Sequence, residues 1–377
     1  MSENTITPLT MPKWGLSMKE GKLINWLVEE GSQFSRGDEL AEVETEKIAS
    51  AVEASMAGTL RKIVAENDTV YPVGALLAVV ADESVSDDEV NAYIEKFQSE
   101  FVPEESGDED EGIQAQTIEV NSLNIRYLSK GDGDRVLLLV HGYGGDLDNW
   151  LFNHDELVEK TGMRVIALDL PGHGQSSKVV GDANLEFFAD TIHAFLQALD
   201  IEKAYLVGHS MGGAISLCFA SKYPDNVLGL GLIASAGLGD EINNEYIQGF
   251  MESTSRKQIK PWLELLFADK SLVNRQLINN MLQYKRLDGV SDALNAVSRQ
   301  LLDDSGKQGR QFLDSLDTLA CRICVVWGMD DHIIPASHTE RLPDSVSKLV
   351  IESSGHMVQM EAANKVNQFL IDNLLTR

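Results

Sequence analysis

The sequence predicts a multidomain protein in which a small all-β sandwich precedes a larger α/β domain with a mainly parallel sheet. The chain has 377 residues, more than the roughly 250–300 at which a single hydrophobic core stops growing. A weak internal repeat occupies the first 81 residues, and apolar strand-like runs alternate with amphipathic stretches from residue 116 onward. We therefore expect domains at residues 1–81 and 116–377, joined by residues 82–115.

The repeat in the first domain has an offset of 37 residues. GKLINWLVEEGSQFSRGDELAEVE aligns with GTLRKIVAENDTVYPVGALLAVVA, and each half reads as short strands joined by glycine-containing turns. Duplication of such a unit favours a sandwich of two similar sheets. The alignment matches Gly21 with Gly58, Leu23 with Leu60, Glu29 with Glu66, Gly37 with Gly74 and Leu40 with Leu77.

Lys47 lies at the junction of the two halves, in ELAEVETEKIASAV. A hairpin tip there would hold the lysine in solvent, where a single lysine is ordinarily a solvated surface charge. The segment nevertheless resembles lipoyl domains, whose modified lysine sits between quasi-symmetric halves, usually within Asp-Lys-Ala. Here Glu46 keeps the acid and Ile48 departs from the pattern; methionines, which usually flank the lysine of biotin carriers, are absent on both sides. The resemblance implies lipoic acid attached covalently to Lys47.

Residues 82–112 contain thirteen acidic residues and one lysine, a composition typical of a solvated, self-repelling linker. Such a linker would let the carrier lysine visit more than one active site. Within it, apolar residues recur at helical spacing behind SDDE: Val90, Tyr93, Ile94, Phe97 and Phe101. This short helix would dock on a partner subunit or pack on its own protein.

Charge and targeting signals narrow the functional classes. A net charge of −28 opposes binding to nucleic acid or to anionic membranes. The N-terminus lacks the basic and apolar pattern of a signal peptide, and no run approaches the roughly 18 apolar residues of a membrane span. We expect a cytoplasmic protein with protein and small-molecule partners. Three cysteines do not suggest a disulfide framework, and CRIC at 321–324 opens an apolar run typical of a buried strand, which favours core packing over a redox or metal site.

The second domain alternates apolar strands with amphipathic segments, a pattern typical of a mainly parallel sheet with helices on both faces. A hairpin-like pair, QTIEVNSLNIRYLS, leads into the strand RVLLLVHG. The stretch from about 238 to 312 lacks strand-like runs and reads as a helical lid.

GHSMG at 208–212 follows an apolar strand and opens a helix. Its glycines permit a sharp strand-to-helix turn that exposes Ser210 as a nucleophile. Such a serine requires a histidine base and an acid that orients the base. Asp331 in WGMDDHIIP and His356 in SSGHM each follow an apolar strand, in the order nucleophile, acid, histidine.

These residues together resemble the α/β-hydrolase superfamily, over about 260 residues. Its acid pattern, a glycine three residues before and a proline four residues after, selects Asp331 over Asp330. HGYGG at 141–145 stands where the superfamily places one oxyanion donor, so the resemblance implies that the backbone N–H groups of Tyr143 and Met211 form the oxyanion hole.

Of the other histidines, His141 and His209 flank the turns and His173 lies in the glycine-rich loop PGHG, whereas the remaining four carry no pattern beyond surface or core positions. No metal-ligand spacing appears.

As a whole, the chain resembles the acetyltransferase components of acetoin dehydrogenase complexes. The resemblance implies transfer of an acetyl group from the lipoyl arm on Lys47 to coenzyme A, with a thiamine-diphosphate-dependent dehydrogenase and dihydrolipoamide dehydrogenase as partners, and a homo-oligomer. The His-x-x-x-Asp-Gly motif of the usual catalytic domain is absent, as is a basic peripheral-subunit-binding pattern. Acetyl transfer through Ser210 is our hypothesis for this chemistry.

Two other functional classes remain open. In the first, the protein is a serine hydrolase, an esterase, a thioesterase or a C–C bond hydrolase, and the lipoyl domain is a passenger. In the second, the hydrolase-like domain has a structural role and its triad is idle.

Overall fold

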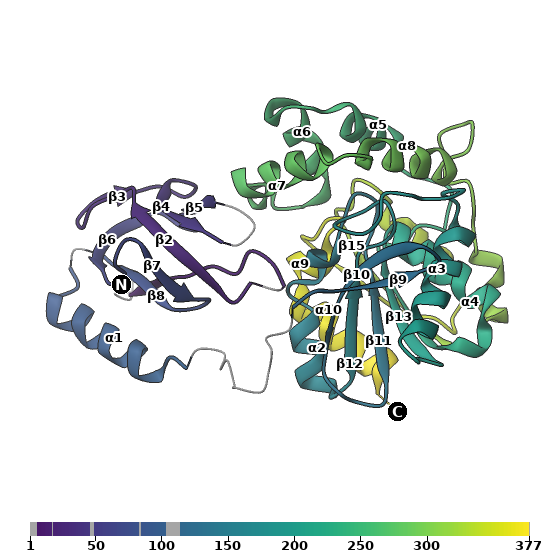
Figure 1. The fold of residues 1–377 in the computed structure, drawn as a ribbon, viewed down its shortest axis with the longest axis horizontal. Coiled ribbons are helices and arrows are strands. Elements are labelled where there is room, and N and C mark those ends of the chain that lie inside the picture. Colours follow the sequence, from purple (N-terminus) through teal and green to yellow (C-terminus); the bar gives the residue numbers. More distant parts are fainter. Residues whose placement is uncertain (1–5, 17, 46–48, 83, 103–113, 377) are drawn as a thin grey trace. The chain divides into compact units, whose positions relative to one another are not determined.

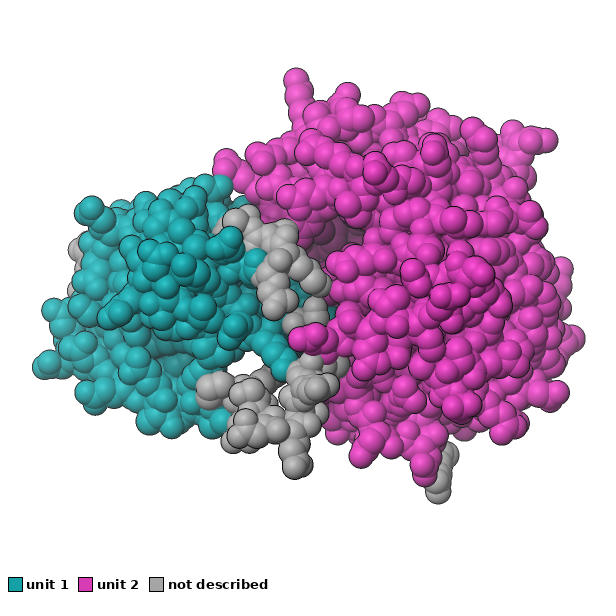
Figure 2. Space-filling model, viewed as in Figure 1, with its two compact units in different colours: residues 1–112 teal, residues 113–377 magenta. Residues whose placement is uncertain are grey.

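The computed structural model describes residues 6–16, 18–45, 49–82, 84–102 and 114–376. The chain divides into two compact units, residues 1–112 and 113–377 (Figure 2). Each unit has its own hydrophobic core.

The first unit is built from two four-stranded antiparallel sheets (Figure 1). Their strand orders are β1-β8-β6-β3 and β5-β4-β2-β7. The strands are β1 (Thr7–Thr10), β2 (Glu20–Trp26), β3 (Gln33–Phe34), β4 (Glu39–Glu44), β5 (Ala49–Glu53), β6 (Gly58–Ile63), β7 (Thr69–Pro72) and β8 (Leu76–Val80). The predicted pair of similar sheets is thus confirmed, but neither sheet corresponds to one half of the repeat. Each half contributes its second strand to the other half's sheet, because β3 pairs with β6 and β7 pairs with β2.

The repeated residues have repeated roles. Leu23 and Leu60, which the repeat aligns, are both fully buried. At Gly21 an added Cβ would lie 2.8 Å from Val43 Cγ1, and at Gly58 it would lie 2.5 Å from Val80 Cγ1. Because Val43 and Val80 are also 37 residues apart, the two glycines leave space for equivalent neighbours.

Lys47 itself lies outside the described residues. The strands on either side of it, β4 and β5, pair in antiparallel fashion, with Glu44 opposite Ala49. The lysine therefore belongs to the segment that links two paired strands.

An amphipathic helix, α1 (Asp87–Glu100), follows the two sheets. Its N-terminus has a capping box in which Ser86 and Glu89 satisfy each other's backbone N–H groups. Val90 is buried against Val79 of β8, with Tyr93, Ile94 and Phe97 packed beside it. Of the two roles considered for this apolar stripe, the structure shows packing on the protein's own first unit. The unit therefore extends past residue 81, because burial of the stripe draws residues 87–100 out of the expected linker.

The second unit has an eight-stranded sheet with the order β16-β15-β14-β13-β11-β12-β10-β9. The six strands β11 to β16 run parallel to one another, whereas β10 pairs in antiparallel fashion with both β12 and β9. The strands of this sheet are β9 (Gln116–Val120), β10 (Leu123–Lys130), β11 (Val136–Val140), β12 (Arg164–Leu168), β13 (Ala204–His209), β14 (Val227–Ile233), β15 (Arg322–Gly328) and β16 (Ser347–Ile351). The predicted hairpin and mainly parallel sheet are confirmed.

Helices cover both faces of this sheet (Figure 1). One face carries α3 (Leu185–Ala198) and α4 (Met211–Lys222); the other carries α2 (His154–Thr161) and α10 (Ala363–Leu370). Between β14 and β15 the chain forms a helical insert of α5 (Asn244–Glu252), α6 (Arg256–Leu263), α7 (Arg275–Lys285) and α8 (Val290–Leu301). These helices lie within the region predicted to be helical.

The cysteines of this unit behave as core residues. Cys324 is buried on β15, where burial raises the pKa of its thiol to about 12. Cys321 precedes the strand, is half-buried and is also a free thiol. Both sulfurs are therefore protonated at neutral pH, unlike the thiolates that bind metals or attack disulfides.

Candidate active site

Ser210 occupies a strained turn between β13 and α4. Its backbone has φ 54° and ψ −119°, a left-handed conformation that is uncommon for a residue with a side chain. The flanking glycines make the turn possible, because an added Cβ at Gly208 would lie 2.3 Å from the Gly212 carbonyl oxygen and one at Gly212 would lie 2.2 Å from the Val140 carbonyl oxygen. The motif glycines therefore permit close backbone packing beneath the serine.

His356 and Asp331 form the hydrogen bond that the sequence predicts. His356 Nδ1 lies 2.8 Å from Asp331 Oδ2, and both side chains are buried. The carboxylate also accepts hydrogen bonds from the backbone N–H groups of Ile333 and Ile334 and from Trp327 Nε1. In a neutral imidazole ring, donation from Nδ1 to a carboxylate places the lone pair on Nε2, which is the arrangement that a general base requires.

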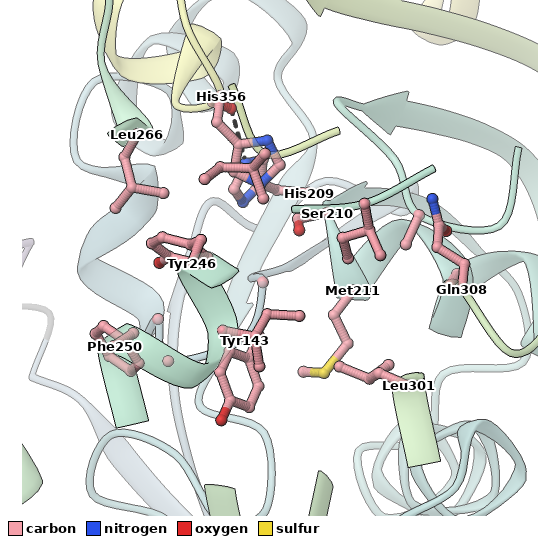
Figure 3. Close-up of a pocket in the computed structure, with 18 of the residues that line it drawn as sticks. Tyr143, His209, Ser210, Met211, Tyr246, Phe250, Leu266, Leu301, Gln308 and His356 are labelled. Carbon is pink, nitrogen blue, oxygen red and sulfur yellow. Dashed lines mark hydrogen bonds between the residues drawn. The ribbon is translucent and has the colours of Figure 1, made fainter. Parts of the chain in front are cut away.

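Ser210 and His356 line the same cavity, and Figure 3 shows their side chains on its wall. The hydrogen bonds of the described residues do not include one between Ser210 Oγ and His356. Contacts between a nucleophile and its base are commonly looser without substrate than in the reacting complex. The structure thus brings all three predicted residues to one place, with the acid–base pair fully formed.

His209, which the sequence reasoning treated as unremarkable, helps to hold the base. Its Nε2 lies 3.0 Å from the backbone carbonyl oxygen of His356. Burial, aided by the neighbouring His356, keeps the pKa of His209 well below its usual range. The neutral ring therefore donates from Nε2 and fixes the loop on which His356 stands. In the sequence, only the position of His209 next to Ser210 in GHSMG could have indicated this supporting role.

The two residues whose backbone N–H groups are expected to form an oxyanion hole both line the cavity. Met211 is the first residue of α4, where N–H groups have no partner within the helix. Tyr143 lies in the loop after β11, and both residues line the cavity. Within the described ranges, no hydrogen-bond acceptor is present for either N–H group. Both donors are therefore available to a negative oxygen, and the helix N-terminus favours that charge.

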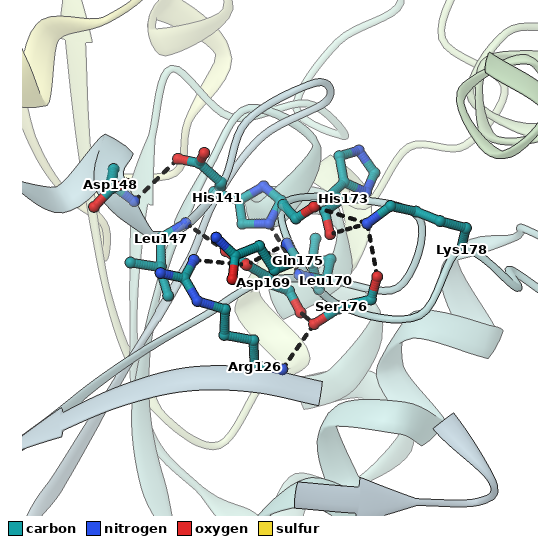
Figure 4. A network of polar contacts seen from close by, with 12 residues as sticks. Arg126, His141, Leu147, Asp148, Asp169, Leu170, His173, Gln175, Ser176 and Lys178 are labelled. Atoms are coloured by element: carbon teal, nitrogen blue, oxygen red, sulfur yellow. Dashed lines mark hydrogen bonds and ion pairs between the residues drawn. The ribbon is translucent and has the colours of Figure 1, made fainter. Parts of the chain in front are cut away.

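A buried ion pair is hydrogen-bonded to the loop that follows β11 (Figure 4). Arg126 Nη1 lies 3.0 Å from Asp169 Oδ2, and both side chains are buried. Asp169 also accepts hydrogen bonds from the N–H groups of Leu147 and Gln175, which ties the loop after β11 to the loop after β12. Sequence reasoning did not single out either charged residue; the signal was an aspartate directly after the apolar run MRVIAL.

His141 links the same two loops. Its Nε2 accepts a hydrogen bond from Leu170 N–H at 3.0 Å, and its Nδ1 donates to the Gly142 carbonyl oxygen at 2.8 Å. Burial lowers the pKa of His141 to about 4, so the ring is neutral and can accept that bond. This histidine is therefore a structural support of the loop that contains Tyr143.

Glu361 joins the His356 loop to the helical insert. Its carboxylate accepts from Gly355 N–H at 2.6 Å and from the N–H groups of Ala268 and Asp269 at 2.9 and 3.1 Å. Met357 N–H, on the other side of His356, donates to the Leu266 carbonyl oxygen at 3.0 Å. The backbone around His356 is thus fastened to residues 266–269, which precede α7.

The cavity has a volume of about 410 Å³ and lies under the helical insert. Figure 3 shows Leu266 and His356 on one side of it, Gln308 and Leu301 on the other, and Ser210 between them. Its lining is mainly apolar and includes Tyr246, Phe250 and Met211. The site can therefore hold a small acyl group and an apolar chain.

The described residues meet neither the requirements of a metal site nor those of a membrane-spanning helix. Within the described ranges, no cluster of three or more histidine, cysteine or acidic side chains is arranged to hold a metal ion. The helices of the described residues are all too short or too polar to cross a membrane.

Comparisons with known proteins match both units. The family model for the alpha/beta hydrolase fold matches residues 135–363, and the model described as Biotin-requiring enzyme matches residues 7–80. A dihydrolipoyllysine-residue acetyltransferase component of an acetoin cleaving system from Pseudomonas putida is 48% identical, over 97% of this chain and 98% of its own length. The protein of the same name from Cupriavidus necator is 45% identical, over 98% of both chains.

This chain belongs to the family of acetoin-cleaving-system acetyltransferase components. The second unit of this family member is also similar to a 2-hydroxy-6-oxononadienedioate/2-hydroxy-6-oxononatrienedioate hydrolase from Escherichia coli, which is 30% identical over 68% of the chain and 92% of its own length. Among solved structures, a meta-cleavage product hydrolase from Pseudomonas fluorescens superposes with a TM-score of 0.61 at 22% identity, over 69% of this chain and 97% of that one. The structural likeness establishes the fold of the second unit.

Proposed function

We propose that this chain transfers an acetyl group from a lipoyl arm on Lys47 to coenzyme A, with Ser210 as the nucleophile. The observation that carries the proposal is a serine on a strained turn, in one cavity with a histidine base that Asp331 orients. This site belongs to a chain whose near full-length relatives are named acetyltransferase components.

The residues present fit a lipoyl group as the donor arm. Lys47 stands between two paired strands of a unit that matches the biotin and lipoyl family model. The mainly apolar cavity around Ser210 suits an apolar chain that ends in a thioester. When attached, the lipoyl group supplies the acyl group as a thioester.

In the first half of the reaction, Ser210 Oγ attacks the acyl carbonyl carbon while His356 Nε2 takes the hydroxyl proton. The N–H groups of Tyr143 and Met211 stabilise the negative oxygen that develops. The C–S bond then breaks, a C–O bond to Ser210 remains, and His356 returns its proton to the departing sulfur. Asp331 stabilises the imidazolium while it exists, through the 2.8 Å hydrogen bond to Nδ1.

In the second half, His356 takes the proton of an incoming thiol, which attacks the acyl-serine carbonyl. The C–O bond breaks, a new C–S bond forms and His356 reprotonates Ser210. One thioester is exchanged for another, so the reaction requires no oxidant. We assign coenzyme A as the thiol. The insert of α5–α8 must keep water from competing, a role consistent with the apolar lining beneath it.

A component of an acetoin cleaving system requires other components. We propose that a thiamine-diphosphate-dependent dehydrogenase loads the arm and that dihydrolipoamide dehydrogenase reoxidises it, around a homo-oligomeric core of this chain.

The test is Ser210→Ala, assayed by the formation of acetyl-coenzyme A from acetyl-dihydrolipoamide. Loss of the nucleophile should lower kcat by about a thousandfold or more. Ser345→Ala serves as the control, because Ser345 is an exposed serine on the segment before β16. Acetyl transfer that continues unchanged in Ser210→Ala would refute the serine mechanism and favour an idle triad.

Hydrolysis is a second candidate function, favoured by the similarity of this unit to the Escherichia coli hydrolase. In that case water replaces the thiol in the second half of the reaction. Product analysis separates the two: with coenzyme A present, free acetate as the main product would support hydrolysis, whereas acetyl-coenzyme A would support transfer.

A further inference from the structure

The cavity that holds Ser210 has one charged wall. Among the described residues that line it, Arg310 is the only lysine or arginine and Glu186 is the only carboxylate. Arg310 Nη1 is paired with Glu186 Oε1. This ion pair joins the segment after α8 to the first turn of α3.

The Arg310 side chain also contacts Phe312, and the residue two positions before it is anchored by hydrogen bonds. Its guanidinium lies over the ring of Phe312 at 4.9 Å, and Phe312 is buried. Two residues earlier, Gln308 is also buried; its Oε1 accepts from Gly237 N–H at 2.7 Å and its Nε2 donates to the Glu241 carbonyl oxygen at 2.8 Å. The guanidinium is therefore presented on a fixed backbone, while its side chain remains 47% exposed.

The carboxylate on Arg310 marks a place where an anion is stable. Glu186 stands in the first turn of α3, a helix of fourteen residues whose N-terminus carries partial positive charge. Asn184 and Leu185, at the same helix end, also line the cavity. A guanidinium beside a helix N-terminus is a chemically suitable environment for a phosphate group.

Of the two thiols in the proposed reaction, only the acceptor is anionic, because the lipoyl arm carries no phosphate. The chain as a whole has a net charge of −28 and repels a polyanion. A cation in the lining of the cavity would therefore discriminate the acceptor from the donor arm.

We infer that Arg310 binds a phosphate group of the acyl acceptor, which displaces Glu186 from the guanidinium. The inference rests on the proposed function for the identity of the acceptor. Arg310 is thus a specificity residue for coenzyme A, and Glu186 is a competitor that occupies the phosphate position when the acceptor is absent.

An alternative role for this ion pair is a clasp between the insert and α3. The two roles predict opposite effects for Glu186→Gln. If Glu186 competes with phosphate, its neutralisation should tighten binding of the acceptor. If the pair is only a clasp, Glu186→Gln and Arg310→Gln should have similar effects, and these should not depend on phosphate.

Calorimetric titration of the full chain with desulfo-coenzyme A tests the inference without any turnover. Arg310→Gln should raise Kd about tenfold, the usual effect of losing one charge-assisted hydrogen bond, and Glu186→Gln should lower it. Arg341→Gln is the matched control, because Arg341 is also 47% exposed and paired with a glutamate, Glu241, but lies outside the cavity lining. The Kd of this variant for desulfo-coenzyme A should equal that of the chain without substitutions.

Turnover adds a second readout. The ratio of kcat/KM for coenzyme A to that for pantetheine, which lacks the phosphates, should fall about tenfold in Arg310→Gln. Unchanged Kd and unchanged ratio in that variant would overturn the inference while leaving acetyl transfer intact. If the chain without substitutions acetylates neither thiol, the proposed function is refuted. The calorimetric titration would still decide whether Arg310 binds the phosphate.

Discussion

The segment that carries Lys47 and the segment that carries Ser210 differ in how their surroundings hold them. On either side of Lys47 the backbone forms regular antiparallel pairs, with Glu44 opposite Ala49. Ser210 instead has a left-handed backbone, and Gly208 and Gly212 beneath it have no space for a methyl group. A carrier residue needs an exit to solvent and freedom to travel, whereas a nucleophile needs a single position relative to its base. Substitutions in the two segments should therefore impair different properties of the protein.

The largest effect is expected for Lys47→Arg. An arginine keeps the charge but has no amine for attachment of lipoic acid, so turnover of the reconstituted acetoin-cleaving complex should fall to the background rate. Ser210 should still react, so transfer from free acetyl-dihydrolipoamide to coenzyme A should persist. These two expectations are checked by measuring acetyl-coenzyme A formation in the reconstituted complex and, separately, from free acetyl-dihydrolipoamide. Lys62→Arg, on β6, is the control; full activity of the complex with Lys47→Arg would refute the carrier role.

Gly212→Ala should instead damage the turn under Ser210. A helix interior usually tolerates alanine better than glycine, by about 1 kcal/mol. Here the added Cβ would meet the carbonyl oxygens of Val140 and His141 at 2.2 and 2.5 Å. We expect the free energy of unfolding of the second unit to fall by about 3 kcal/mol, measured by urea denaturation. In Gly309→Ala the nearest atom is 3.6 Å away, so the same measurement should change by less than about 1 kcal/mol.

Acid should destabilise the second unit selectively, since all eight histidines of the chain lie there. Burial lowers the pKa of His141 to about 4 and that of His173 to about 3, against about 6.5 in the unfolded chain. The unfolded state therefore binds protons first, and stability that is complete above pH 6.5 is lost as the pH falls toward 4. Each histidine contributes a slope of up to about 1.4 kcal/mol per pH unit.

Differential scanning calorimetry between pH 7 and pH 5 measures this effect. The unfolding transition of the second unit should move to lower temperature in this range, and that of the first unit should move less. His141→Gln keeps a neutral side chain with an acceptor and should reduce the slope. A slope that stays the same in this variant would show that His141 is not among the groups responsible.

Local sequence signals predicted the parts of this protein that depend on neighbours in the chain. Gly208, Ser210 and Gly212 are close in sequence, and the order of Ser210, Asp331 and His356 followed from the ends of apolar strands. In the first unit, the repeat matched Leu23 with Leu60, and the structure buries both. The repeat did not predict that β3 and β7 exchange sheets, because strand pairing is set by contacts between the two halves.

The supports of the site could not be predicted for the same reason. Arg126 and Asp169 are 43 residues apart, and Arg310 and Glu186 are 124 apart. Asp169 follows an apolar run in the sequence, but no local pattern pairs any of these residues with its partner. Only the fold shows that one pair is buried beside the loop after β11 and that the other lines the cavity.

The smallest expected effect tests how tightly the position of His356 is set. In Glu361→Gln, the remaining oxygen can still accept from Ala268 and Asp269, but an NH₂ group faces Gly355 N–H, which then loses its acceptor. We expect kcat for acetyl transfer to fall about tenfold, equivalent to about 1.4 kcal/mol. Glu352→Gln, at an exposed glutamate just after β16, should leave kcat unchanged. The rate at which a fluorophosphonate labels Ser210 reports on the histidine directly and should fall in parallel with kcat. If the melting temperature falls while labelling stays at its original rate, Glu361 stabilises the insert without positioning His356.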